Sequence, residues 1–323
     1  MSESILQIRD LTVTFATPLG PLVAVRGVDL DVGAGELVAV VGESGSGKSV
    51  SFLAAMGLLP STATVQGSVM LDGVQLVGAS AKQMRSVRGR LLSMIFQDPL
   101  SALNPVHRIG AQISEMLRAH QKMSERAARA RAVELLEVVG IPQPGDRAMQ
   151  YPHEFSGGMR QRVVIAMAIA NSPKVLIADE PTTALDVTVQ AQILEVIQKV
   201  QKQFGTAVVL ITHDLGVVAR VCDRVNVMYA GRFVERAAVS DLFDAPTHPY
   251  TRGLLASLPQ AGKERLVPIV GFPPNMLRPP SGCAFRARCA DAISDCEQAV
   301  PELRAVGAAQ SACIRAAELM QPR

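Results

Sequence analysis

Apolar and polar positions along the chain follow two periods, one typical of strands and one typical of helices. Segments that alternate between apolar and polar residues, as half-buried strands do, lie near the N-terminus at residues 5–8, 11–15 and 28–32. Continuous apolar runs that suit buried parallel strands occur at residues 37–41, 174–178 and 207–211. Helical patterns lie between these runs, and strands alternating with helices predict a parallel α/β core.

The clearest helical pattern lies between the last two apolar runs. Asp186 can cap its start, apolar residues recur at helical spacing from Val189 to Phe204, and Gly205 can end it. Residues 50–56, directly after the first continuous run, are also helix-like.

The amino-acid composition changes at two places along the chain. An Ala-, Arg- and Glu-rich region contains a helix that begins at Ser124 and ends at Gly140. Near the C-terminus, prolines crowd residues 268–280 and four of the five cysteines follow. We therefore expect a first domain over residues 1–255, with a helical subdomain inserted at about 104–160, and a small module over residues 256–323.

Composition and charge narrow the function classes. The 323 residues are 48% hydrophobic, which excludes a disordered chain, and a net charge of +3 is too small for a sequence-blind nucleic-acid binder. The N-terminal residues are acidic where an export signal is basic, and the longest clean apolar stretch, residues 163–170, is far shorter than a membrane span. We expect a cytoplasmic protein. Because only 19% of its residues are charged, part of its surface is expected to meet partners.

The run Gly42-Glu-Ser-Gly-Ser-Gly-Lys-Ser49 fits a phosphate-binding loop, since it follows a buried strand and precedes a helix. Its glycines let backbone N–H groups turn toward a β-phosphate, Lys48 supplies charge to the β- and γ-phosphates, and Ser49 offers a hydroxyl to Mg²⁺. The alternative is a plain glycine-rich turn. The predicted contacts of this segment to ATP come from Gly42, Ser44, Gly45, Ser46, Gly47, Lys48, Ser49 and Val50.

Two carboxylates stand at the end of the buried run Val175-Leu-Ile-Ala-Asp-Glu180. Asp179 would hold Mg²⁺ through water, and Glu180 would polarise the water that attacks the γ-phosphate; the alternative is a solvated acidic turn. His213, after the last strand, could reach the γ-phosphate or the same water, although a lone histidine is more often a structural hydrogen-bonder. Gln97 alone is weak evidence for a functional role, because a glutamine in a loop is usually just solvated.

The segment Ser156-Gly-Gly-Met-Arg-Gln-Arg162 resembles the signature motif of ABC ATPases. The order of motifs over residues 1 to about 240 is also that of this family: the phosphate loop, Gln97, the signature, Asp179-Glu180, Ala184-Leu-Asp186 and His213. The resemblance implies an α/β fold of the P-loop NTPase class and ABC type. Its parts are a mainly parallel sheet core, an N-terminal antiparallel β-subdomain, a helical subdomain insert and a small C-terminal cysteine-containing module.

The resemblance also assigns roles to residues. It implies that Ser156, Gly157 and Gly158 cap the γ-phosphate of ATP held by a partner subunit. Met159 departs from the commonest signature, which has Gln there, and a thioether cannot donate an amide hydrogen bond. Three further roles are implied: adenine stacking for Phe15, Mg²⁺ sensing and contact with membrane subunits for Gln97, and organisation of the dimer interface for Asp186.

Three longer motifs narrow the resemblance further: Phe96-Gln-Asp-Pro-Leu-Ser-Ala-Leu-Asn-Pro105, Glu154-Phe-Ser-Gly-Gly-Met-Arg-Gln-Arg162 and Thr247-His-Pro-Tyr-Thr251. They are similar to the ATPase subunits of dipeptide and oligopeptide importers. This implies ATP hydrolysis that powers peptide import, at the cytoplasmic face of the inner membrane. The implied partners are a second, related ATPase subunit, two transmembrane permease subunits and an extracytoplasmic peptide-binding protein, with no nucleic acid. The same machine could import nickel or another small solute. A soluble ABC ATPase acting on nucleic acid or ribosomes is disfavoured, since neither heptads nor a second phosphate loop is present.

Four cysteines, Cys283, Cys289, Cys296 and Cys313, lie in a tail that is too poor in apolar runs to build a large core. A four-ligand metal centre would stabilise such a module, whereas disulfides are not expected in a reducing cytoplasm. The spacing is wider than that of usual zinc sites, and the resemblance implies a 4Fe–4S cluster held by the four thiolates. Zn²⁺ and free thiols are the alternatives.

Overall fold

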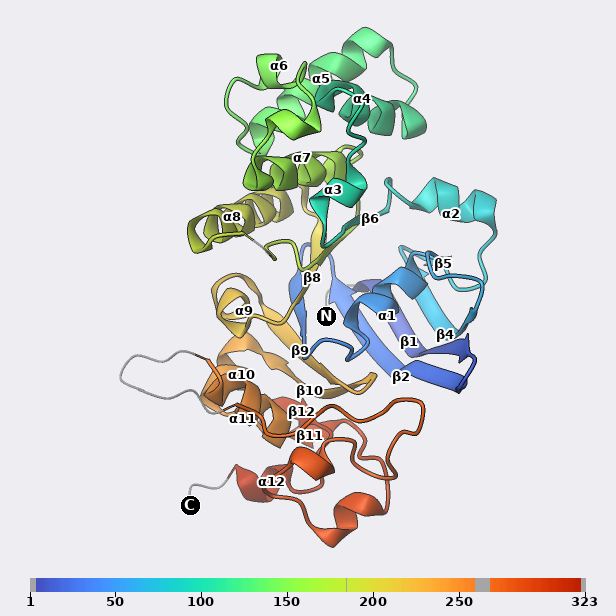
Figure 1. Cartoon of the computed structure of the whole chain (residues 1–323), viewed down its shortest axis with the longest axis vertical. Helices are drawn as coiled ribbons and strands as arrows, with labels where there is room; N and C mark the ends of the chain where they lie inside the picture. Colours follow the sequence, from blue (N-terminus) through green and yellow to red (C-terminus); the bar gives the residue numbers. More distant parts are fainter. Residues whose placement is uncertain (1–3, 184, 259–267, 321–323) are drawn as a thin grey trace. The chain divides into compact units, whose positions relative to one another are not determined.

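The structure is a computed structural model that describes residues 4–183, 185–258 and 268–320. The chain forms two units, whose helices and strands are labelled in Figure 1. Unit 1 comprises Met1–Leu6, Asp31–Leu37 and Met70–Leu210. Unit 2 comprises Gln7–Leu30, Val38–Val69 and Ile211–Arg323.

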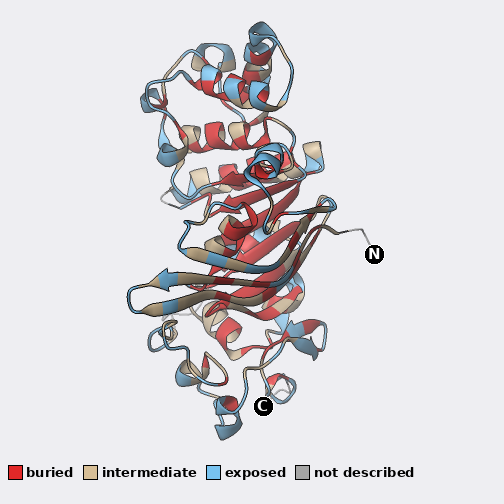
Figure 2. Ribbon diagram, turned by 90° about the vertical axis from the view of Figure 1, so that its right-hand side faces the viewer, coloured by how far each residue is buried: buried red, intermediate tan, exposed pale blue. Residues whose placement is uncertain are grey.

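Three buried strands form the core of unit 1, in the order β8-β7-β6. β6 (Leu92–Ile95) pairs in parallel with β7 (Val175–Asp179), and β8 (Ala207–Thr212) lies on the other side of β7. All residues of these strands are buried (Figure 2). Continuous burial is expected where both faces of a sheet are covered, so the strands predicted from apolar runs at 174–178 and 207–211 are confirmed.

Helices that pack on one another make up most of the remainder of unit 1. α4 (Ile109–His120), α5 (Glu125–Val138) and α7 (Gly157–Ile169) are in mutual contact, and α7 also packs against β6 and against α8 (Val187–Phe204). α4 and α5 lie inside the segment predicted as a helical insert. The other elements of unit 1 are β5 (Val74–Gln75), α2 (Ala81–Val87), α3 (Pro99–Ala102), α6 (Pro144–Arg147) and a 3₁₀ helix at Pro152–Glu154.

The boundaries of α8 follow the signals in the sequence. The Asp186 carboxylate caps the helix by accepting a hydrogen bond from the Val189 N–H at 2.9 Å. Gly205 ends it in the left-handed conformation, with φ of 63°. The predicted helix is confirmed at both ends.

The N-terminal strands lie mostly in unit 2, where a sheet has the order β2-β1-β4. β1 (Ser4–Thr17) and β2 (Gly20–Gly33) are joined by the turn at residues 18–19, and β4 (Ala63–Leu71) lies beside β1.

β1 corrects the prediction of two separate strands at residues 5–8 and 11–15. Asp10 interrupts the alternation with φ of 46°, and its backbone N–H donates to the Asp29 carboxylate at 2.8 Å. Gly67 approaches so closely that a Cβ there would lie 2.4 Å from the Asp10 carbonyl oxygen. The neighbouring strands therefore hold the kink inside one continuous strand.

Five strands of the chain's other sheet, which is mixed, lie in unit 2 in the order β3-β9-β10-β12-β11. β3 (Leu37–Val41) pairs in parallel with β9 (Arg224–Tyr229), and β10 (Arg232–Ala238) pairs antiparallel with β9. β12 (Ala309–Ser311) pairs with β10, and β11 (Arg304–Val306) with β12. Strands from the cysteine-bearing tail thus extend this sheet, while the predicted division of the chain at residue 255 stays a prediction.

A single core joins the tail to the rest of unit 2. Val41 and Val227 from the sheet share it with Tyr229, Tyr250 and Phe285, and Cys283 and Cys289 pack against it. The remaining elements of unit 2 are α1 (Lys48–Ala55), α9 (Leu215–Val221), α10 (Val239–Asp244), α11 (Pro249–Ala256), α12 (Ala316–Leu319) and 3₁₀ helices at Arg286–Arg288 and Ser294–Glu297. Within the described ranges, no helix has the length and apolar character to cross a bilayer.

Candidate functional site

The glycine-rich loop of unit 2 runs from the end of β3 into α1. Gly42 has φ of 154°, and a Cβ there would lie 2.1 Å from the carbonyl oxygen of Met228 in β9. Gly47 has φ of 104°, and a Cβ there would lie 2.7 Å from the carbonyl oxygen of Ala24 in β2. Both clashes are with backbone, so only glycine lets the loop lie this close to β2 and β9.

Several hydrogen-bond donors gather in this loop. No side chain of the described residues caps the N-terminus of α1, so its first-turn N–H groups can bind an anion. The buried Lys48 ammonium donates to the carbonyl oxygens of Gly42 and Glu43 at 2.8 and 3.0 Å. The buried Ser46 hydroxyl has no hydrogen-bond partner among the described residues. A loop with this charge and these donors suits phosphate oxygens. The other predicted contacts, Ser44, Gly45, Ser49 and Val50, lie in the same loop and first helical turn.

The acidic strand end lies in unit 1, where the structure brings two predicted residues together. Asp179 is the buried last residue of β7. Glu180 follows with φ of 46°, a left-handed conformation that is uncommon for residues other than glycine. Its Oε2 accepts a hydrogen bond from the Thr183 hydroxyl at 2.8 Å and another from Gln97 Nε2 at 3.5 Å. Two donors from separate segments thereby orient one carboxylate oxygen.

The signature segment forms the exposed N-terminus of α7 in unit 1. Ser156 is the N-cap, and its hydroxyl accepts from the Met159 N–H at 3.4 Å. A Cβ on Gly158 would lie 2.5 Å from Val189 Cγ1, so a larger residue there would force the Val189 side chain or α7 itself to shift. Gly157 is exposed at the helix start. The contribution of Met159 to this cap is its backbone N–H, which any residue except proline would supply.

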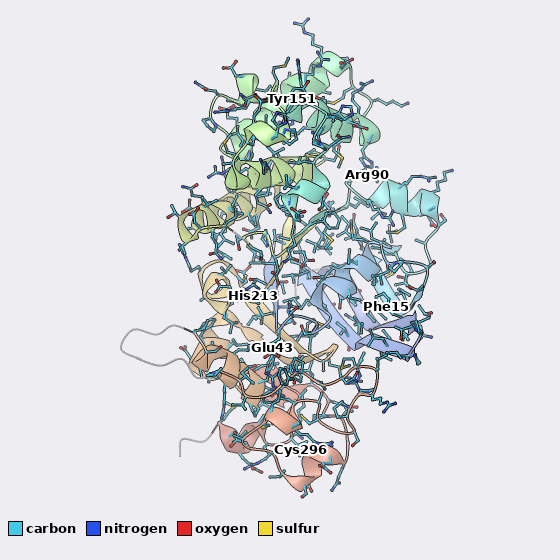
Figure 3. The ribbon with its side chains drawn as sticks, viewed as in Figure 1. Phe15, Glu43, Arg90, Tyr151, His213 and Cys296 are labelled. Carbon is cyan, nitrogen blue, oxygen red and sulfur yellow. The ribbon has the colours of Figure 1, made fainter. Side chains whose placement is uncertain are left out.

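Three further predicted residues come from other segments of the chain. Asp186 is exposed and caps α8, and its neighbour Ala184 lies outside the described residues. Phe15 is partly exposed on β1, and His213 is exposed directly after β8 (Figure 3). The structure joins Gln97 to Glu180 in unit 1 and gathers the phosphate loop in unit 2. That both sets surround one nucleotide stays a prediction.

A group of contacts at Glu43 was missed by the sequence analysis. Arg288 donates two hydrogen bonds to the Glu43 carboxylate, at 2.7 and 2.9 Å, and the Tyr250 hydroxyl accepts one from the Glu43 N–H at 2.8 Å. The guanidinium of Arg288 also lies 5.8 Å from the centre of the Tyr229 ring. Tyr250 belongs to the motif Thr247-His-Pro-Tyr-Thr251, but no local pattern links that motif to the phosphate loop.

The four tail cysteines, Cys283, Cys289, Cys296 and Cys313, line one small cavity in unit 2. Burial raises the pKa of the Cys289 thiol to about 11 and also raises the pKa values of Cys283 and Cys313. Among the described residues, no three His, Cys, Asp or Glu side chains stand close enough to hold a metal ion. The shared cavity brings the four sulfur atoms to one place, and the predicted 4Fe–4S cluster stays a prediction.

Comparisons with known proteins agree with these features. The chain matches the family model "ABC transporter" over residues 25–183 and "Oligopeptide/dipeptide transporter, C-terminal region" over residues 234–296. It is 54% identical over 303 residues to the oligopeptide transport ATP-binding protein OppD of Bacillus subtilis, covering 92% of this chain and 85% of that protein. It is 52% identical over 304 residues to the dipeptide transport ATP-binding protein DppD of the same organism, covering 93% and 90%.

A solved structure shares the fold. The ATP-binding cassette MJ0796, in a dimeric post-hydrolysis state bound to ADP and Pi, matches with a TM-score of 0.65 and 28% identity. The match covers 72% of this chain and 98% of that one. The predicted P-loop NTPase fold of ABC type is confirmed. With its loop, its acidic strand end and its C-terminal region, the chain belongs to the ABC transporter family, among the ATP-binding subunits of oligopeptide and dipeptide transporters.

Proposed function

We propose that this chain is the ATP-hydrolysing subunit that powers an importer of dipeptides or oligopeptides. The observation that carries the proposal is the match of residues 234–296 to the C-terminal region of oligopeptide and dipeptide transporters, on the same chain as the ABC transporter match. The chain would act at the cytoplasmic face of the cell membrane as a peripheral subunit. Two transmembrane permease subunits would form the path, and an extracytoplasmic binding protein would deliver the peptide.

ATP binding would rest on the phosphate loop. The Lys48 ammonium supplies positive charge for the β- and γ-phosphates, the first-turn N–H groups of α1 donate to phosphate oxygens, and the Ser46 hydroxyl offers a further donor. Phe15 would stack on the adenine. Ser49, Gln97 and Asp179 would hold Mg²⁺, which when bound neutralises charge between the β- and γ-phosphates.

Hydrolysis would depend on Glu180. Its carboxylate polarises the attacking water, and the hydrogen bonds from Thr183 and Gln97 keep one oxygen oriented. His213 would contact the γ-phosphate or the same water. The water adds to the γ-phosphorus as the bond to the bridging oxygen breaks, and ADP and phosphate leave.

A second ATPase subunit would complete the site. Ser156, Gly157 and Gly158 lie at an exposed helix start, which suits them to cap the γ-phosphate held by that partner. Asp186 would organise the interface between the two subunits. We propose a heterodimer with a related ATPase subunit.

The cysteine tail would hold a 4Fe–4S cluster through Cys283, Cys289, Cys296 and Cys313, because the four side chains line one cavity. When bound, a cluster cross-links the tail through four iron–thiolate bonds. Anaerobically purified protein would then be brown and contain iron and acid-labile sulfide. A colourless protein with one equivalent of zinc would favour the alternative.

Peptide import is tested on the chain co-purified with its membrane partners, reconstituted with the binding protein and titrated with short peptides and with nickel chelates. We expect peptides to stimulate ATP hydrolysis. Stimulation by nickel alone would support the same type of importer, with nickel and not peptide as its substrate. Failure to recover any membrane partner would favour a soluble ABC ATPase that acts on nucleic acid or ribosomes.

The role of Glu180 is tested in the same preparation. Glu180→Gln should keep ATP binding and lower turnover by about 10²–10⁴-fold, because the water loses its base. Glu195→Gln, an exposed change on α8 of the same unit, is the matched control and should hydrolyse ATP normally. Near-normal hydrolysis by Glu180→Gln would remove Glu180 from this role.

A further inference from the structure

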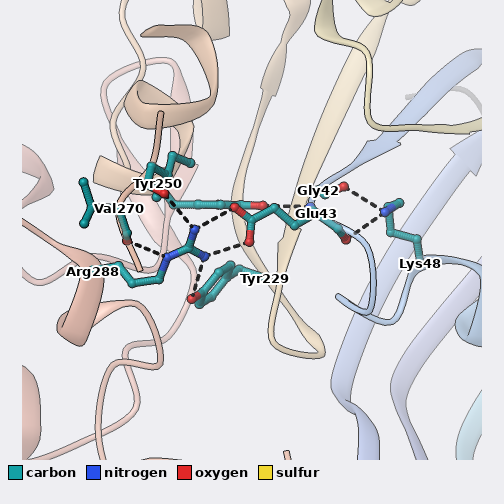
Figure 4. Close-up of polar contacts among 8 residues, drawn as sticks. Gly42, Glu43, Lys48, Tyr229, Tyr250, Val270 and Arg288 are labelled. Carbon is teal, nitrogen blue, oxygen red and sulfur yellow. Dashed lines mark hydrogen bonds and ion pairs between the residues drawn. The ribbon is translucent and has the colours of Figure 1, made fainter. Parts of the chain in front are cut away.

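One arginine of the cysteine tail reaches the phosphate loop. The two terminal nitrogens of Arg288 pair with the two carboxylate oxygens of Glu43, at 2.7 and 2.9 Å (Figure 4). The Arg288 side chain is only 6% exposed and that of Glu43 27%, so the pair is largely shielded from water. A planar, two-point contact of this kind fixes direction as well as distance.

Each polar group of Glu43 has a different partner. Its carboxylate binds Arg288, its N–H donates to the Tyr250 hydroxyl, and its carbonyl oxygen accepts from the Lys48 ammonium at 3.0 Å. Tyr250 is fully buried and packs against Tyr229, with ring centres 4.6 Å apart. Glu43 therefore contacts both Lys48, the phosphate-binding cation, and residues from the C-terminal part of unit 2.

The backbone that carries Arg288 is bound to the cysteines. The Arg286 N–H donates to the Cys283 carbonyl oxygen, and the Cys289 N–H donates to the Arg286 carbonyl oxygen, both at 3.2 Å. Arg288 thus lies in a short turn between two cysteines of the shared cavity. Its Nε donates to the Val270 carbonyl oxygen at 3.1 Å, which restricts the side chain on the other side.

We infer that Arg288 is a positioning residue for ATP binding: through Glu43 it holds the phosphate loop, and with it Lys48, in the arrangement that takes the nucleotide. The cysteine tail thereby sets the affinity of the loop for ATP. The inference rests on the proposed ATP site. It concerns residues of unit 2 alone, whereas Glu180 and Gln97, which are assigned to hydrolysis, belong to unit 1.

The test measures ATP hydrolysis and Mg–ADP binding by the full chain with its membrane partners. Arg288→Gln should raise KM for ATP and Kd for Mg–ADP about tenfold, with kcat within about twofold, because binding and not the chemical step is perturbed. Arg288→Lys, which keeps the charge but loses the two-point contact, should fall between the wild type and Arg288→Gln. Glu43→Gln should raise KM and Kd as much as Arg288→Gln does. The double variant should raise them no further than either single variant, since both changes remove the same Arg288–Glu43 contact.

The control is Arg252→Gln. Arg252 is another partly buried arginine of unit 2, and it donates to the carbonyl oxygens of Pro246 and Leu319. If Arg252→Gln raises KM as much as Arg288→Gln does, general destabilisation explains the effect and the inference is wrong. An unchanged KM in folded Arg288→Gln overturns it as well.

Two further variants keep the outcomes separate. If Arg288→Gln fails to fold, Tyr250→Phe keeps the ring packing and removes only the acceptor for the Glu43 N–H; it should raise KM severalfold, and an unchanged KM would refute the inference. Lys48→Ala tests the proposed site itself. If Lys48→Ala retains its affinity, the ATP site is wrongly assigned; if it loses affinity while Arg288→Gln retains it, only the role of Arg288 fails.

Discussion

We predict that unit 2 loses stability in mild acid because its buried His248 is neutral in the folded state. Its side chain is 1% exposed and caps α11, with Nδ1 accepting a hydrogen bond from the Tyr250 N–H at 3.1 Å. Burial, together with the nearby positive charge of Arg252, lowers the pKa of His248 from its ordinary value of 6.5 to about 3. Protonation would also remove the acceptor that caps the helix. The buried Glu235 carboxylate accepts from the His248 backbone N–H and stays in place when the side chain is changed.

The magnitude follows from the two pKa values. The folded state holds His248 neutral, so the unfolded state binds more protons below pH 6.5 and stability falls as pH falls. One pKa unit corresponds to about 1.4 kcal/mol, and pH 5 lies 1.5 units below the unfolded value, so the loss at pH 5 is about 2 kcal/mol. It would continue toward pH 3, where the folded protein also takes up the proton. For a unit of this size, about 2 kcal/mol lowers Tm by roughly 4–8 °C.

The comparison that isolates this effect is wild type against His248→Asn. Asparagine also caps helices and cannot be protonated, so the constant cost of the smaller side chain cancels between pH values. The chain has three tyrosines and no tryptophan, so in a Tyr151→Phe background tyrosine fluorescence reports only on Tyr229 and Tyr250, both in the core of unit 2. Urea unfolding at pH 7.5 and 5.0 should show wild type losing about 2 kcal/mol more than the variant. Equal losses in the two proteins would refute the assignment of acid sensitivity to His248.

Two changes in unit 1 test the packing and capping of the signature region. Gly158→Ala should lower the free energy of unfolding by about 1–3 kcal/mol, because the new Cβ would lie 2.5 Å from Val189 Cγ1. Adding Val189→Ala should recover part of this loss, as measured by thermal unfolding. A Gly158→Ala variant as stable as the wild type would show that the close contact does not limit packing. Asp186→Ala should cost about 1 kcal/mol by removing the cap of α8, whereas Asp186→Asn should cost little. If Asp186→Asn is as stable as wild type yet hydrolyses ATP poorly with its partners, the charge serves the subunit interface; normal hydrolysis would leave Asp186 a cap only.

Features set by neighbours in sequence were predictable. The apolar run before Gly42 and the helical run after Ser49 place the phosphate loop, and the glycine, lysine and serine pattern specifies its chemistry. The limits of α8 follow from Asp186 and Gly205, which act within one helical turn of the ends. In each case, the free energy that selects the conformation comes from contacts a few residues apart.

Features set by distant contacts were missed. Glu43 and Arg288 are 245 residues apart, and in sequence each is an ordinary charged residue of a loop. The kink at Asp10 depends on Asp29 and on the close approach of Gly67, which come from two other strands. No local pattern encodes such pairs, because either partner alone would be solvated and would leave the backbone free to adopt another conformation.

The contacts that hold the phosphate loop explain why its sequence pattern specifies no residue type at position 43. Glycines are needed at Gly42 and Gly47 because backbone of β9 and β2 approaches there, and Lys48 is needed for its charge. Position 43 faces the tail, so its best residue depends on what the tail presents. Where the tail presents Arg288, a carboxylate gains two hydrogen bonds that a neutral residue cannot match. Binding of ATP would then vary with changes in the tail, while the chemical step would vary with changes around Glu180 and Gln97. Variants of the two groups should separate into those that raise KM and those that lower kcat.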